Sequence, residues 1–168
     1  LLFGGIEPAH DIGLPRAAQA LACCPRVIAV TPFADAAVMS FAQILLPMGT
    51  FAETSGSYVN VEGRWQEFRG CAQPVGEARP GWKILRVLGN QLGFVGFDYE
   101  STADVLSELR RSADGIGYDG RLADVGEFKA ERRGTTTTIP IYKVDPIVRR
   151  ATALQLTRAG LNGAARTG

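Results

Sequence analysis

RVIAVTPFADAAVMSFAQILL, residues 26–46, decides the expected fold because two short apolar runs stand on either side of a helical pattern. The runs at 26–30 and 44–46 are typical of buried strands. Between them, Asp35 can cap a helix over about residues 35–41, since its carboxylate can accept hydrogen bonds from free backbone N–H groups. A strand, a helix and a second strand in this order predict a parallel pairing.

The segment before this stretch repeats the same pattern. An apolar run at 1–4 and a helical pattern over about 14–22 precede it. The order strand, helix, strand, helix, strand predicts the α/β fold class, with a Rossmann-like parallel βαβαβ portion over residues 1–50. The pair Gly4-Gly5 lacks the G-x-G-x-x-G spacing of a dinucleotide-binding loop, so a tight exit from the strand is favoured over a phosphate site.

Residues 51–111 form a second section, with a β-hairpin followed by two amphipathic helices. The β-prone runs 57–61 and 64–68 flank Glu62-Gly63, and Gly63 can adopt the positive φ that a tight turn requires. A helix is expected between Pro80 and Gly93, and a capping box that starts at Ser101 opens the next helix. The inward face of the first helix is expected to carry Ile84, Leu85, Leu88 and Leu92.

The last third of the chain carries weaker signals. Residues 112–137 are rich in glycine and charge, and they are expected to form a surface excursion. Residues 138–168 are expected to hold a terminal strand, a short helix and a frayed tail. The strand is assigned to the β-prone run at 137–142, the helix starts at Asp145-Pro146, and fraying begins near residue 159.

Composition and charge limit the classes of partner. Eighteen basic and seventeen acidic residues give a formal net charge of +1, and no basic stripe is present, so a nucleic-acid partner is not expected. The longest apolar stretch, 36–48, is shorter than the roughly twenty residues of a membrane span, so no direct membrane insertion is expected. The apolar first residues include no initiator Met, and we expect the chain to be a piece of a longer polypeptide.

The cysteines and the histidine do not indicate a metal site in this segment. Cys23, Cys24 and Cys71 are an odd number, and two of them are adjacent, which favours a reducing compartment over a disulfide framework. An iron–sulfur cluster needs about four thiolates, and a tetrahedral zinc site needs four ligands. His10 is the single histidine, and we expect it to lie in a loop or at a helix start.

A dense motif after the third expected strand carries a family resemblance. Its residues are Leu46-Pro47, Glu53, Gly56, Ser57, Asn60, Glu62, Gly63, Arg64 and Gln66. In this order the motif resembles the molybdopterin oxidoreductase family, in which a strand ending in Leu-Pro precedes Glu-x-x-Gly and Asn-x-Glu-Gly-Arg. The resemblance implies that the chain is a fragment of a molybdopterin oxidoreductase-like domain.

Within this family, three further stretches are similar to the C-terminal part of the large iron–sulfur subunits of NADH-quinone oxidoreductases, respiratory complex I. They are residues 68–90, 96–101 and 141–157. The resemblance implies a non-catalytic scaffold portion of an enzyme that carries electrons from NADH to quinone. It implies iron–sulfur clusters elsewhere in the parent subunit, FMN on a partner subunit, and no cofactor in this segment.

The same resemblance implies a place and a set of partners. The partners are the other peripheral-arm subunits of complex I, and the place is the cytoplasmic side of the bacterial inner membrane, or the matrix side in mitochondria. The isolated fragment is expected to have no activity and to self-associate through apolar surface. The alternative is a fragment of an active molybdopterin-dependent oxidoreductase, similar to formate dehydrogenases.

The motif also gives the candidate site residues. In a working relative, the corresponding pocket would present groups at Glu53, Gly56, Asn60, Glu62 and Arg64, so these residues are candidates for a relic cofactor pocket. A structural role is favoured for them: Glu53 accepts N–H groups of its own loop, Asn60 closes the turn, and Arg64 pairs with Glu62 or Glu53. No catalytic residue and no metal ligand is assigned in this segment.

Overall fold

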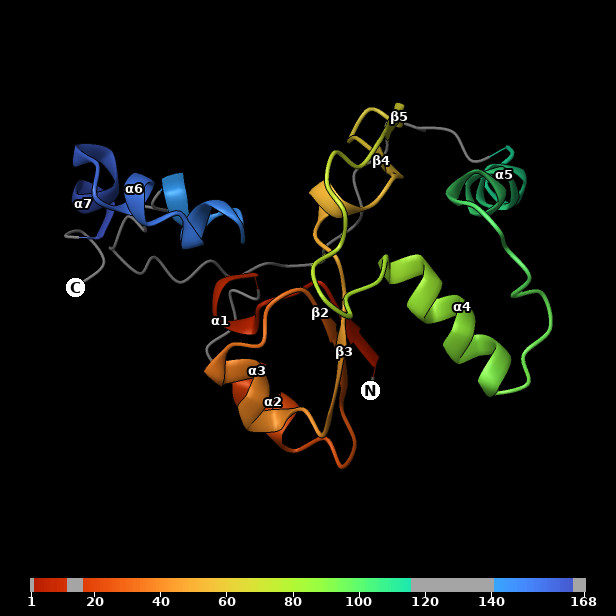
Figure 1. Ribbon diagram of the computed structural model, residues 1–168, viewed down its shortest axis with the longest axis horizontal. Helices are drawn as coiled ribbons and strands as arrows, with labels where there is room; N and C mark the ends of the chain where they lie inside the picture. The colour runs from red at the N-terminus through yellow and green to blue at the C-terminus, as the bar shows by residue number, and fades with distance from the viewer. Residues whose placement is uncertain (1, 12–16, 116–140, 165–168) are drawn as a thin grey trace, which may run out of the picture. The chain divides into compact units, whose positions relative to one another are not determined.

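The computed structural model describes residues 2–11, 17–115 and 141–164, and its chain divides into two compact units (Figure 1). Unit 1 comprises the described residues within Leu1–Ile6 and Leu21–Leu122. Unit 2 comprises those within Glu7–Ala20 and Ala123–Gly168. The division of the chain into four consecutive sections, at residues 50, 111 and 137, stays a prediction.

Unit 1 is built on a three-stranded parallel sheet, which confirms the expected α/β fold class. The strands are β1 (Leu2–Gly4), β2 (Ile28–Thr31) and β3 (Ile44–Pro47), in the spatial order β1-β2-β3. Helix α2 (Ala17–Ala22) precedes β2 in the chain, and α3 (Ala36–Phe41) precedes β3. The short helix α1 (Pro8–Asp11) was not expected, because four residues are too few for a periodic pattern.

The core of unit 1 lies between the central strand and the helices that flank it in the chain. Its buried residues are Leu21, Val27, Ala29, Val38 and Phe41. Helix α3 is held in register at its start, where the Asp35 carboxylate accepts from the Val38 backbone N–H at 2.8 Å, as the sequence predicts. This cap orients α3 so that Val38 and Phe41, three positions apart, point into the same core.

The hairpin that follows the sheet also matches the prediction. Strands β4 (Gly56–Val59) and β5 (Trp65–Phe68) pair antiparallel, and the 3-10 turn η1 (Phe51–Glu53) precedes them. Gly63 has φ +76° at the tip of the hairpin, a conformation that side chains with a Cβ rarely adopt. Within the hairpin, Tyr58 and Phe68 stack with ring centroids 5.1 Å apart.

Two helices follow, α4 (Gly81–Gln91) and α5 (Thr102–Ser112), close to the expected bounds. The capping box of α5 is present, with the Ser101 hydroxyl accepting from the Asp104 N–H and the Asp104 carboxylate accepting from the Ser101 N–H. Helix α4 packs closely at Gly89, which is buried and whose added Cβ would meet the ring of Phe97.

Four residues of the α4 region are predicted to point inward, and this prediction is wrong for two of them. Ile84 and Leu88 are half-buried, but Leu85 and Leu92 are 42% and 60% exposed. The apolar face that α4 buries is therefore narrower than its hydrophobic periodicity predicts. Its one buried residue is Gly89, because the close approach of Phe97 takes place there.

Unit 2 consists of short helical elements. They are α1, the 3-10 turns η2 (Ile141–Lys143) and η3 (Val148–Arg150), α6 (Thr152–Gln155) and α7 (Arg158–Ala164). The terminal strand expected at 137–142 is wrong at residues 141 and 142, which start η2, while 137–140 lie outside the described residues. The frayed tail is likewise wrong for 159–164, since α7 continues through them, and 165–168 lie outside the described residues.

A buried ion-pair cluster connects the two chain segments of unit 2. The side chains of Glu7 and Arg149 are only 6% and 5% exposed, and Arg149 Nη1 lies 3.4 Å from Glu7 Oε2. Arg149 Nη2 lies 3.2 Å from Asp11 Oδ1, and Arg150 Nη1 lies 2.7 Å from Glu7 Oε1. Two carboxylates thus face two guanidinium groups, which neutralises charges that burial would otherwise penalise.

The helix expected to start at Asp145-Pro146 is wrong, since the structure has the 3-10 turn η3, whose N-cap residue is Ile147. The Asp145 carboxylate nevertheless caps the turn that precedes η3. The Asp145 carboxylate accepts from the backbone N–H groups of Ile147 and Val148 at 2.9 Å. The Asp145 carbonyl accepts from the Arg149 N–H at 2.9 Å. The cap therefore places Arg149 at the position from which it reaches Glu7.

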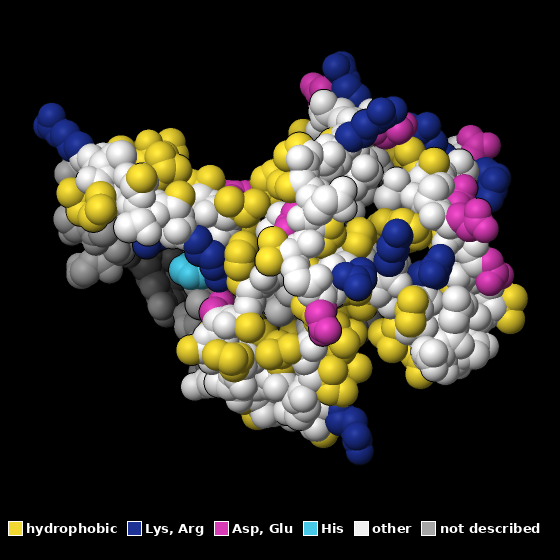
Figure 2. Space-filling model, viewed as in Figure 1, with side chains coloured by type: hydrophobic (Ala, Val, Ile, Leu, Met, Phe, Trp, Pro, Cys, Tyr) yellow, Lys and Arg dark blue, Asp and Glu magenta, His cyan; other side chains and the backbone are white. Residues whose placement is uncertain are grey.

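Hydrophobic side chains are spread over the face of the molecule that Figure 2 shows. Large apolar residues with at least half of their surface exposed include Ile44, Val61, Val75, Phe94 and Val95. None of the helices in the described ranges has the length and hydropathy of a membrane span. The exposed apolar surface is the kind of surface on which the expected self-association would depend, and that expectation stays a prediction.

Candidate functional site

Glu53 holds the loop that joins the sheet to the hairpin. Its Oε2 accepts from the Thr50 backbone N–H at 2.7 Å and from the Thr50 hydroxyl at 2.9 Å, which completes a capping box on η1. Its Oε1 accepts from the Val75 backbone N–H at 3.1 Å, across 22 residues of sequence. Both oxygens of the carboxylate are therefore used by the protein itself.

These hydrogen bonds lower the pKa of Glu53 below its usual range. The backbone N–H of Thr50 contributes most, followed by the Thr50 hydroxyl, while partial burial opposes the effect. Because the folded pKa is lowered, the stabilisation is fully present above the pKa of the unfolded chain. It is lost as the pH falls through the folded value.

Replacing Glu53 by alanine is expected to lower the free energy of unfolding by about 1 kcal/mol at pH 7, because three donors lose their acceptor. Urea unfolding followed by tryptophan fluorescence measures this loss. As the pH falls below about 4.5, the ordinary pKa of a glutamate, the difference between the two proteins should shrink.

The matched control is Glu77→Ala, at an exposed glutamate outside these contacts, and it should change stability by less than about 0.5 kcal/mol. An equal loss in both variants, or a Glu53→Ala deficit that does not depend on pH, would contradict the role assigned to this carboxylate.

Asn60 closes the hairpin turn. Its side-chain oxygen accepts from the backbone N–H groups of Glu62 and Arg64 at 3.0 and 2.9 Å, and its amide nitrogen donates to Glu62 Oε2 at 3.4 Å. This arrangement is an Asx-type turn, in which a side chain replaces backbone hydrogen bonds. The amide that the motif offers is thus engaged locally, as the structural interpretation predicts.

Gly56 and Arg64, two further candidates, differ from the expected cofactor-pocket and ion-pair roles. Gly56 lies in β4 against the ring of Phe68, which leaves little room for a Cβ. Arg64 is exposed, and among the described residues no ion pair joins its guanidinium to Glu62 or Glu53. The expected pairing of Arg64 is therefore wrong. The structure does not bring the five candidates together: Asn60, Glu62 and Arg64 meet in the hairpin turn, whereas Glu53 lines a cavity that the other candidates do not line.

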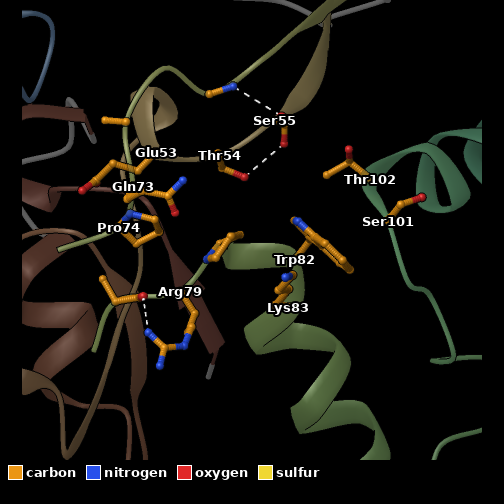
Figure 3. A pocket seen from close by; sticks show the side chains of 14 residues that line it. Glu53, Thr54, Ser55, Gln73, Pro74, Arg79, Trp82, Lys83, Ser101 and Thr102 are labelled. Carbon is orange, nitrogen blue, oxygen red and sulfur yellow. Dashed lines mark hydrogen bonds between the residues drawn. The ribbon is translucent and has the colours of Figure 1, made fainter. Parts of the chain in front are cut away.

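That cavity has a volume of about 560 Å³ and opens beside Glu53 (Figure 3). The start of α4 contributes Trp82 and Lys83, and the start of α5 contributes Ser101 and Thr102. Other polar residues that line it are Thr54, Ser55, Gln73 and Arg79. Sequence reasoning missed this part of the site, although Arg79 to Lys83 lie in a stretch that the family resemblance covers.

The lining of this cavity does not form a complete site for a molybdopterin cofactor. Its cations and hydroxyl groups match an anionic group in general, but several of them are already engaged. The Ser55 hydroxyl accepts from the Gly70 N–H at 3.3 Å, the Ser101 hydroxyl from the Asp104 N–H at 3.2 Å, and Arg79 donates to the Ala78 carbonyl at 2.9 Å. No cysteine lines the cavity, so its lining offers no thiolate ligand to a metal.

The cysteines and acidic residues do not gather elsewhere in the described part of the chain. Cys23 and Cys71 are exposed thiols. Across residues 2–11, 17–115 and 141–164, no three histidine, cysteine, aspartate or glutamate side chains lie close enough together to hold a metal ion.

The comparisons with known proteins match the part of the chain that contains β2, β3, the hairpin and α4. Residues 13–91 match the model of the family described as molybdopterin oxidoreductase. Similar proteins include a protein named "Putative formate dehydrogenase" from Staphylococcus aureus strain bovine RF122 / ET3-1, 31% identical over 83 residues, and one of the same name from strain USA300, 30% identical over 83 residues.

Each alignment covers 48% of this chain and 8% of the relative. The aligned part is therefore a small portion of the curated proteins that it matches. Residues 13–91 are thus similar to a molybdopterin oxidoreductase family domain.

Proposed function

We propose that this chain is a non-catalytic scaffold portion of the large iron–sulfur subunit of NADH-quinone oxidoreductase. The main support for the proposal is the hydrogen bonding of Glu53. Both of its carboxylate oxygens accept hydrogen bonds from the protein itself, at Thr50 and Val75. A carboxylate that serves its own loop is a structural element, and the Asn60 turn is occupied in the same way.

The proposal includes a place in a larger assembly. The resemblance of residues 68–90, 96–101 and 141–157 to complex I subunits supports membership of the peripheral arm, on the cytoplasmic side of the inner membrane or the matrix side in mitochondria. In that assembly, clusters elsewhere in the parent subunit and FMN on a partner subunit carry electrons from NADH towards quinone. This segment maintains shape and contacts neighbouring peripheral-arm subunits.

A second candidate function is supported by the names of the relatives. The matched proteins are named as formate dehydrogenases, so a fragment of an active molybdopterin-dependent oxidoreductase is the alternative. In that case the cavity beside Glu53 would contribute to the surroundings of a pterin cofactor, and the missing ligands would come from other parts of the polypeptide.

Metal analysis of the complete polypeptide that contains this segment distinguishes the two functions. The scaffold function predicts iron and sulfide, with neither molybdenum nor tungsten, and no pterin fluorescence after oxidative release. It also predicts that the tagged polypeptide copurifies with NADH:quinone reductase activity from solubilised membranes. Stoichiometric molybdenum or tungsten with a pterin would overturn the scaffold function and support the alternative.

A further inference from the structure

An apolar groove runs between β3 and α4, within unit 1. Its volume is about 460 Å³, and its exposed lining is almost entirely apolar, contributed by Leu46 of β3 and by Ile84, Val87 and Leu88 of α4. Val87 remains 48% exposed. The groove explains why part of the apolar face of α4 is not buried against its own unit.

The groove is bordered by positive charge. Arg79, Lys83 and Arg86 line it together with the apolar residues, and the sequence from 79 to 91 contains no acidic residue. In Figure 2, dark blue side chains gather over the region where α4 begins in Figure 1. An apolar surface with a border of one sign of charge is complementary to an apolar ligand that carries the opposite charge.

Within the described residues, none of these three cations is paired with a carboxylate. The Lys83 ammonium lies 5.4 Å from the centre of the Trp82 ring, and Arg79 donates to a backbone carbonyl. Arg86 donates through Nη1 to the Tyr99 carbonyl at 2.9 Å, but its Nε is buried and has no hydrogen-bond partner. Within the described residues, no carboxylate therefore neutralises the positive charge beside the groove.

The strand beside the groove favours a polypeptide as the occupant. Among the described strands, β3 pairs only with β2, so it lies at an edge of the sheet. At its end this edge is occupied, since the Arg79 N–H donates to the Pro47 carbonyl at 3.2 Å, and the part of the edge from Ile44 to Leu46 stays without a described strand beside it. Ile44 is 50% exposed and lies on the same face of β3 as Leu46, so it continues the apolar surface of the groove along this edge. An exposed edge strand can pair with the backbone of another chain, which a lipid tail cannot do.

We propose that the groove between β3 and α4 binds a segment of a partner polypeptide in which apolar side chains are flanked by carboxylates. The apolar side chains fill the space beside Val87, and the carboxylates face Arg79, Lys83 and Arg86. The inference is independent of which parent enzyme contains the chain, because it rests on the groove, its cationic border and the edge of β3.

The test uses the 168-residue chain and a short synthetic peptide in which leucine and glutamate alternate. Fluorescence anisotropy of the labelled peptide measures the dissociation constant. A second peptide, with lysine in place of every glutamate, should bind at least about 10-fold more weakly, since its charges meet the cationic border. Raising the salt concentration should weaken binding of the glutamate peptide.

Val87→Asp should weaken binding of the glutamate peptide by about 10-fold or more, because it puts a carboxylate into the groove. The position is 48% exposed, so the variant should keep the wild-type circular dichroism spectrum. Val95→Asp, at a position 98% exposed outside the groove lining, is the matched control and should bind within about twofold of the wild type. Lys83→Glu should narrow the difference between the two peptides.

Three outcomes would overturn the proposal. The first is equal affinity for the glutamate and lysine peptides, and the second is unchanged binding in the folded Val87→Asp variant. The third is binding of another occupant: palmitate that displaces the glutamate peptide at equal concentration would assign the groove to lipid. A dimer that dissociates in Val87→Asp, without peptide binding in the wild type, would assign it to a second copy.

Discussion

Replacing Arg149 by methionine is expected to destabilise unit 2 by about 3 kcal/mol, because it breaks a buried ion pair. Arg149 is nearly fully buried and contacts both Glu7 and Asp11. Methionine keeps much of the apolar stem but removes the charge, which leaves Glu7 with Arg150 alone. The expected loss of stability is at the lower end of the range for breaking a buried ion pair, because Arg150 still neutralises part of the charge of Glu7.

Amide hydrogen exchange followed by mass spectrometry measures this effect where it arises. Peptides from α6 and α7 should lose protection in Arg149→Met, while peptides from the sheet of unit 1 should keep it. The control Arg158→Met removes an arginine from the same unit that lies outside the ion-pair cluster, and it should leave protection unchanged. Wild-type protection of α6 and α7 in Arg149→Met would show that the cluster contributes nothing to the stability of unit 2.

Replacing Phe41 by alanine is expected to lower the free energy of unfolding of unit 1 by about 3 to 4 kcal/mol, because it opens a cavity in the core. Phe41 is 5% exposed and packs in the same cluster as Val27, Ala29 and Val38. A core of five buried side chains cannot easily collapse into the space that a phenyl ring leaves.

Tryptophan fluorescence reports this effect in unit 1, since both tryptophans of the chain, Trp65 and Trp82, lie there. In urea, the midpoint of the fluorescence transition should fall while its slope stays unchanged. The control Phe94→Ala removes a ring that is 58% exposed and should cost less than about 1 kcal/mol. If the two variants lost equal stability, the cluster around Phe41 would not be the main core of the unit.

The sheet and the hairpin could be predicted because local signals and long-range packing agree in them. The apolar runs of β2 and β3 are separated by a helix whose cap is visible as Asp35, and the hairpin turn is marked by Gly63. In α4, by contrast, hydrophobic periodicity gives the phase of a helix but not how much of its face is covered. Leu85 and Leu92 therefore follow the predicted pattern and are still exposed.

The candidate site shows a similar limit. The motif identified Glu53 and Asn60 as residues with fixed roles, and their bonds to Thr50, Val75 and the turn match the predicted structural role. The cavity beside Glu53 could not be predicted, because Trp82 and Thr102 reach it from separate helices. The ion-pair cluster of unit 2 was also missed, since no local pattern links an arginine near the end of the chain to a glutamate near its start.

The sequence separation of that cluster has a consequence for the order of folding. Glu7 and Arg149 are 142 positions apart, so their contact closes a loop of nearly the whole chain. Closing so large a loop costs entropy that is recovered only when both segments have become ordered. During synthesis, the parallel sheet and the hairpin can form before Arg149 and Arg150 have left the ribosome. Until then, residues 7–11 lack their partners. Unit 2 is thus expected to form last and to be the first target of proteases in chains whose synthesis stops early.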